Sequence, residues 1–112
     1  MSRPAALAAA AAHFDNGSFA RDLARRVAIH SESQDPAQAG ALHAYVADEL
    51  STSLAALGFG CELFDNPLQG TGCGPFLIAT RHEDDTLPTV LMYGHGDVVR
   101  GQDASWTRGQ GP

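Results

Sequence analysis

Apolar residues recur at every third or fourth position over much of the first half of the chain, the spacing that places them on one face of a helix. This pattern predicts a first helix over residues 4–14, ended by Asn16 and Gly17, and a second helix for which Ser18 is the N-cap. The second helix carries one apolar stripe, formed by Phe19, Leu23 and Val27.

The strongest helix pattern lies between Asp35 and Gly58. Asp35 is placed as an N-cap, Pro36 follows at the first helical position, and Gln38 stands three residues after the cap, as in a capping box. Gly58 supplies the C-terminal stop. We therefore predict a long helix over residues 36–57. Its apolar face is formed by Leu42, Val46, Leu50, Leu54 and Leu57.

After this helix the period changes to that of strands. Residues 59–64 alternate in polarity, and residues 76–80 form a second short run. A third run, residues 90–93, is apolar throughout, which predicts a strand buried on both faces, as in the middle of an α/β sheet. Helices followed by strands indicate an α/β fold class of which the chain holds only the first elements. We expect the third strand to expose apolar surface that further elements would cover.

Composition and charge indicate which classes of function are not expected for this chain. The chain has 112 residues, 44% hydrophobic and 18% charged, which is typical of a single globular domain. Its net charge is -6 and its basic residues are scattered arginines, so nucleic-acid binding is not expected, and Arg25 and Arg26 are interpreted as a solvated helix surface. The alanine-rich start is a poor match to a signal peptide and no segment could span a membrane, which favours a cytoplasmic location without membrane contact.

Two further patterns have ordinary structural explanations. Gly70, Gly72 and Gly74 alternate, but the segment leads into a strand, so a hairpin connection is favoured over a phosphate-binding loop. Cys61 and Cys73 are too sparse for a disulfide framework or a structural zinc site, which favours two reduced thiols over a disulfide or ligand role.

The candidate for chemistry is the segment TVLMYGHGD at residues 89–97, where the third predicted strand ends. His95 and Asp97 are two residues apart, so in extended backbone they point to the same side. The carboxylate can then hold one imidazole nitrogen while the other faces a metal ion. Gly94 and Gly96 remove side-chain bulk beside the pair. The spacing alone leaves open a structural histidine that is merely hydrogen-bonded to an aspartate.

The other histidines are weaker candidates for a metal site. Three of them belong to predicted helices or helix ends without a suitable second ligand, and the fourth precedes an acidic run that is typical of a solvated turn. They are His13, His30, His43 and His82.

The wider segment VLMYGHGDVV, followed by Trp106, resembles the M20 family of zinc peptidases and amidohydrolases, which includes acetylornithine deacetylase, succinyl-diaminopimelate desuccinylase and several dipeptidases. The pattern of that family is an apolar strand, then HxD, then usually Val-Val-Pro, with a tryptophan downstream. This chain has Arg100 in place of the proline. Trp106 either packs beneath the loop or fills the core, two roles that the sequence does not separate.

The resemblance implies that His95 is a ligand to one zinc ion of a two-zinc centre and that Asp97 orients it. It also implies that a metal-activated water cleaves an amide bond in a small peptide or N-acyl amino acid, and that the full-length protein carries a smaller domain often used to form a homodimer. The bridging aspartate, the general-base glutamate and the remaining ligands of the family lie downstream of the HxD motif.

A catalytic zinc typically has three protein ligands, and His95 supplies one. After Asp97 the sequence contains no histidine or glutamate, and Asp103 is the only carboxylate. We therefore expect residues 1–112 to be the N-terminal part of a catalytic metallohydrolase domain, without a complete second domain and inactive alone. The alternative is a non-catalytic remnant or interaction module that keeps only the start of the fold.

Overall fold

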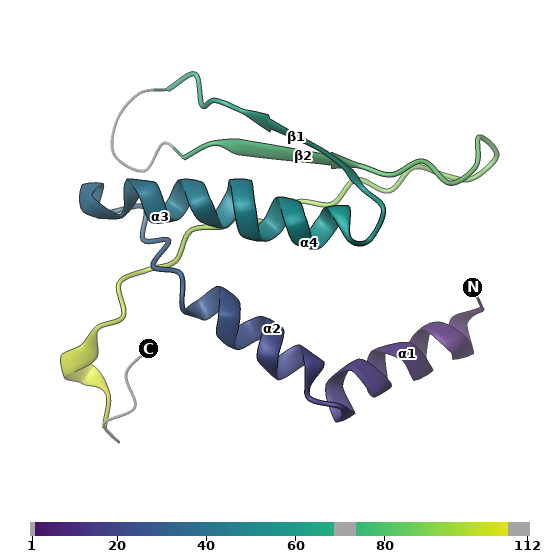
Figure 1. Ribbon diagram of the computed structural model, residues 1–112, viewed down its shortest axis with the longest axis horizontal. Coiled ribbons are helices and arrows are strands. Elements are labelled where there is room, and N and C mark those ends of the chain that lie inside the picture. Colours follow the sequence, from purple (N-terminus) through teal and green to yellow (C-terminus); the bar gives the residue numbers. More distant parts are fainter. Residues whose placement is uncertain (1, 69–73, 108–112) are drawn as a thin grey trace.

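The computed structural model describes residues 2–68 and 74–107, and in these ranges helices combine with one small antiparallel sheet (Figure 1). This agrees with the general α/β class predicted from the order of the patterns. The elements in chain order are α1 (Arg3–Asp15), α2 (Ser18–Val27), a 3-10 turn η1 (Pro36–Gln38), α3 (Ala39–Ala44), a π-helical segment η2 (Tyr45–Leu50), α4 (Ser51–Ala55), β1 (Gly60–Phe64), β2 (Phe76–Thr80) and a 3-10 turn η3 (Asp103–Ser105). None of these described helices is both long and apolar enough to cross a bilayer.

The two N-terminal helices form where the sequence predicts them, and only their junction differs. Gly17 adopts a φ of 78°, a conformation that glycine tolerates without strain. The prediction that Ser18 is the N-cap of α2 is wrong, because Gly17 holds that position and Asn16 Oδ1 accepts the hydrogen bond from Ser18 N at 2.9 Å. The Ser18 hydroxyl instead accepts a hydrogen bond from Arg21 Nη2 at 2.9 Å.

The predicted apolar stripe of α2 lies at the surface. Its members, Phe19, Leu23 and Val27, are all exposed, and neither α1 nor α2 contributes a buried residue. Phe14 of α1 lies against Phe19, with ring centroids 5.8 Å apart. Both helices extend away from the rest of the molecule (Figure 1), so they stand outside the core.

The helix predicted over residues 36–57 forms as a continuous run from η1 through α4. Asp35 caps it as predicted, because Asp35 Oδ1 accepts a hydrogen bond from Ala37 N at 3.0 Å. Gly58 follows the last turn with a φ of 85°, which confirms the predicted stop. The difference lies in the middle of the helix, where η2 is π-helical.

The core lies between this helical run and the β-hairpin, and it is small. Leu42 and Val46 are the buried apolar residues of the described ranges, at 7% and 8% exposed. Leu57, the last predicted position of the apolar face, is 61% exposed beyond the end of α4. The chain is correspondingly flat, with principal extents of 48 × 40 × 19 Å.

The predicted strands β1 and β2 pair antiparallel, with Cys61 opposite Ala79. One face of this hairpin lies on the helical run (Figure 1), where Cys61 Sγ is 3.6 Å from the carbonyl oxygen of Ser51. The opposite face carries Phe76 and Ile78, which remain exposed. A single layer of helix therefore covers one side of the sheet.

The strands before and after the glycine-rich segment pair antiparallel, as the predicted hairpin requires. At Gly74 a Cβ atom would lie 2.8 Å from Leu42 Cδ2, so this glycine lets the hairpin approach the core leucine closely. Three residues of the sequence predictions lie outside the described ranges: Gly70, Gly72 and Cys73.

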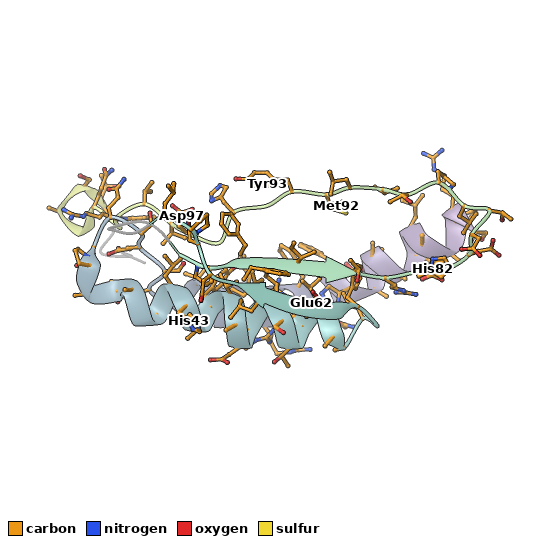
Figure 2. All side chains as sticks on the ribbon, turned by 90° about the horizontal axis from the view of Figure 1, so that it is seen from above. His43, Glu62, His82, Met92, Tyr93 and Asp97 are labelled. Carbon is orange, nitrogen blue, oxygen red and sulfur yellow. The ribbon has the colours of Figure 1, made fainter. Side chains whose placement is uncertain are left out.

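The third predicted strand does not form. Residues 90–93 pair with no strand in the described part of the chain, and Leu91 and Tyr93 are 95% and 91% exposed. Figure 2 shows the segment that carries Met92 and Tyr93 running apart from β1 and β2. A strand is held by hydrogen bonds to a neighbouring strand, and no described segment pairs with this one. The predicted burial is wrong for this structure, whereas the predicted exposure of apolar surface is confirmed.

An ion-pair network joins α2 to the helical run. Arg25 binds Glu49 in a two-point contact, Nε to Oε2 at 2.8 Å and Nη2 to Oε1 at 2.9 Å. Arg26 Nε and the Ser53 hydroxyl also donate to Glu49 Oε1, at 3.3 and 3.1 Å. Arg25 and Arg26 remain solvent-accessible, as predicted for a solvated helix surface, with side chains 50% and 37% exposed, but both also bind Glu49 of η2.

These contacts make stability depend on pH. Hydrogen bonds from Arg25, and then from Ser53, lower the pKa of Glu49 from 4.5 to about 2. A carboxyl whose pKa is lower in the folded state stabilises the fold above pH 4.5, and this stabilisation is lost as the pH falls from 4.5 to about 2. Because the Arg25 side chain is half exposed, solvent screens its interaction with Glu49. We therefore expect acidification through this range to lower the free energy of unfolding by about 1–2 kcal/mol.

Urea unfolding of the wild-type chain and of Glu49→Gln across this pH range measures the effect. The variant should be less stable at neutral pH and should show a smaller loss on acidification. Glu83→Gln is the control, since Glu83 pairs with Arg81 on an exposed turn. Equal acid sensitivity of the wild-type chain and Glu49→Gln would contradict the assignment.

Candidate metal-binding loop

The loop that carries the HxD motif is anchored to the segment between α2 and η1. Val98 N donates a hydrogen bond to the carbonyl oxygen of Ser31 at 3.1 Å, and Glu32 and Val98 form an isolated parallel bridge. Ser31 is 1% exposed, the most deeply buried polar residue in the described ranges. The anchor therefore holds the chain immediately after Asp97 against a packed part of the molecule.

His95 and Asp97 lie beside each other, as the sequence predicts. His95 Nδ1 is 3.0 Å from Asp97 Oδ1 and 3.1 Å from the Asp97 carbonyl oxygen. Because both partners are acceptors, the neutral ring carries its proton on Nδ1, and Nε2 keeps its lone pair. The His95 side chain is 71% exposed, so Nε2 is accessible from solvent. The loop thus presents an imidazole nitrogen in the state that a metal ion requires.

The Asp97 carboxylate is held from its other side by Ser33. The Ser33 hydroxyl donates to Asp97 Oδ2 at 2.8 Å. This hydrogen bond, and then the one from His95, lowers the pKa of Asp97 below its usual range, so the carboxylate is ionised at neutral pH. Since the serine hydroxyl donates to the aspartate, the imidazole is not placed as its base, and the three residues do not form a nucleophilic triad.

No pattern in the sequence points to Ser33. It lies 64 residues before Asp97 in the chain and belongs to no motif. No spacing rule connects a serine in an interhelical segment to a loop that far downstream. Only the backbone anchor at Ser31 and Val98 brings the two segments together.

The two glycines of the motif have different roles. A Cβ atom at Gly96 would lie 3.0 Å from two ring carbons of Tyr45 and 3.5 Å from Val46 Cγ2, so the loop approaches η2 closely. At Gly94 a Cβ atom would meet no atom within 4 Å. Neither glycine has a positive φ. In the described structure the absence of a side chain is thus required at Gly96, by the Tyr45 ring, and not at Gly94.

Trp106 lies outside the core. Its indole Nε1 donates to the carbonyl oxygen of Gly101 at 2.6 Å, and its side chain is exposed. The core-filling role is therefore wrong. The tryptophan closes a local turn around η3, and its hydrogen bond does not reach His95 or Asp97.

The remaining candidates do not gather at the loop. His82 pairs with Asp85 at 3.4 Å on an exposed turn, which confirms the prediction for the acidic run. Figure 2 places this turn at the opposite end of the molecule from Asp97. Within residues 2–68 and 74–107, no three side chains of histidine, cysteine, aspartate or glutamate converge on a common point. The loop accordingly offers one accessible imidazole nitrogen with its supporting carboxylate.

Comparisons of the chain with protein-family models, with curated proteins and with solved structures give no match. The functional interpretation rests on the motif and on the geometry of the loop.

Proposed function

We propose that this chain is the N-terminal part of a zinc-dependent hydrolase that cleaves amide bonds in small peptides or N-acyl amino acids. The observation that carries the proposal is the pairing of His95 Nδ1 with Asp97 Oδ1 at 3.0 Å, with Nε2 accessible. The sequence around the pair, VLMYGHGDVV, supports it through its resemblance to the M20 family.

The chemistry of the donors fits zinc. A neutral imidazole is a preferred ligand of this ion, and a carboxylate on the second ring nitrogen orients the ring and increases its basicity. His95 would bind the metal through Nε2, and Asp97 would hold the ring. A bound zinc ion supplies a water of lowered pKa and polarises the carbonyl group that is attacked.

One imidazole is too few for a catalytic zinc, which typically has three protein ligands. We propose that the other ligands, a second zinc site and the general base come from a further segment of a longer protein. The same segment would cover the exposed apolar residues at 90–93. In this proposal the chain by itself has no amidase activity, and any dimerisation belongs to the longer protein.

Zinc binding by the purified chain tests the ligand assignment. We expect weak binding, measured by competition with a chromophoric chelator, and its loss in His95→Ala. His82→Ala is the matched control, because His82 also pairs with an aspartate but lies far from the loop. Zinc binding that is unchanged in His95→Ala, or absent in the wild-type chain, would disprove the ligand assignment.

The nucleotide sequence beyond codon 112 separates the hydrolase from the non-catalytic alternative. We expect the open frame to continue into a glycine-rich segment with an aspartate, followed by a Glu-Glu pair. A frame without these residues would favour a remnant or interaction module.

A further inference from the structure

We propose that Ser33 is a positioning residue that fixes the Asp97 carboxylate and, through it, keeps His95 Nε2 available to a metal ion. The observation behind the proposal is the continuous hydrogen-bonded series from the Ser33 hydroxyl to Asp97 Oδ2, at 2.8 Å, and from Asp97 Oδ1 to His95 Nδ1, at 3.0 Å. Its consequence for zinc rests on the proposed function, whereas its effect on the imidazole can be measured without metal.

The position of Ser33 is set by its backbone surroundings. Ser31, two residues earlier, accepts the hydrogen bond from Val98 N and is almost fully buried. Residues 31–33 therefore run beside residues 97–98 and deliver the hydroxyl to Asp97. A side chain held from such an anchor loses little further freedom when it forms its hydrogen bond.

Without this hydroxyl, Asp97 would have little to keep it in place. Its side chain is 44% exposed, and among the described residues its side-chain hydrogen bonds go to Ser33 and His95. If Ser33 did not hold Oδ2, the carboxylate could turn toward water and release His95 Nδ1. The ring could then place its proton on Nε2, and that tautomer cannot bind a metal ion through Nε2.

Long-range proton–nitrogen NMR on the metal-free, histidine-labelled chain measures the tautomer directly, at about pH 9, above the range in which imidazoles usually titrate. The His95 signal is identified by its loss in His95→Ala. We expect the wild-type ring to carry its proton mainly on Nδ1. In Ser33→Ala the ratio of the Nε2-protonated to the Nδ1-protonated form should rise by about threefold or more. Ser33→Thr, which keeps the hydroxyl, should restore the wild-type ratio.

Ser53→Ala is the matched control, since it also removes a hydroxyl that donates to a carboxylate, at Glu49 and away from the loop. It should leave the His95 tautomer unchanged. An unchanged tautomer in Ser33→Ala, or an equal change in both alanine variants, would overturn the proposal. Should Ser33→Ala fail to fold, the Hα–Hβ couplings of Asp97 in the wild-type chain decide the matter: a single rotamer supports positioning by Ser33, and averaged couplings overturn it.

Zinc affinity provides the second measurement. Loss of a group that orients a metal-bound histidine typically weakens binding by about 10–100-fold, and we expect about 3–10-fold for Ser33→Ala because it acts through Asp97. If the wild-type chain binds no zinc, the proposed function fails, and the metal-free tautomer comparison still decides the role of Ser33. A tautomer change with unaltered zinc affinity would overturn the metal-binding part of the inference.

Discussion

Replacement of Leu42 by alanine is expected to lower the free energy of unfolding by about 2–4 kcal/mol, the usual cost of truncating a buried leucine. Leu42 is 7% exposed and packs between the helical run and the hairpin, where its Cδ2 lies close to Gly74. Val46 is the other buried apolar residue of the described ranges, so few neighbouring side chains can repack to fill the cavity that the substitution leaves. The substitution should therefore remove a large part of the total stability.

Urea unfolding followed by circular dichroism measures this effect. Leu57→Ala is the matched control, because it deletes the same atoms from a residue that is 61% exposed, and it should cost less than about 1 kcal/mol. Similar destabilisation by the two variants would show that the core does not lie between the helical run and the hairpin.

Gly96→Ala is expected to cost about 1–3 kcal/mol through overpacking and to displace the candidate site at the same time. The added Cβ atom would lie 3.0 Å from the Tyr45 ring and 3.5 Å from Val46, so either the loop or the tyrosine must move. Movement of the loop would separate Asp97 from the Ser33 hydroxyl that holds its carboxylate. We therefore expect both a lower free energy of unfolding and weaker zinc binding.

The neighbouring glycine supplies the control. Gly94→Ala adds the same methyl group where no atom lies within 4 Å, and it should be nearly neutral in both measurements. Combining Gly96→Ala with Tyr45→Ala should recover part of the lost zinc affinity, because the clashing ring is removed. If the two glycine variants behave alike, the close approach of the loop to η2 is wrong.

The helices are the part of the fold that sequence pattern describes well. Asp35, Gly58 and the glycine after α1 act locally, through their own backbone conformation or through hydrogen bonds to residues two or three positions away, so their effects follow from the residues themselves. Ser18 shows the limit of this approach. Its type suits an N-cap, but its hydroxyl accepts from the Arg21 side chain instead of a helix amide, and Gly17 takes the N-cap position.

The third strand shows what a pattern cannot decide. Residues 90–93 have the apolar composition of a central strand, yet a strand needs a neighbour to accept and donate its hydrogen bonds. In the described structure no such neighbour pairs with them, and the segment is exposed. Composition specifies the environment that a segment prefers, and the tertiary structure determines whether that environment is present.

At the candidate site, the sequence by itself determined the pairing of His95 with Asp97, because two residues that alternate in extended backbone share one side whatever surrounds them. The tertiary structure alone decided what supports the pair. The Ser33 hydroxyl lies 64 residues away in sequence, and Tyr45 packs over Gly96 from a separate helix. These contacts form between segments that are distant in sequence, so no local spacing of residues predicts them. The HxD motif predicts a metal ligand, and the fold supplies the groups that hold it in place.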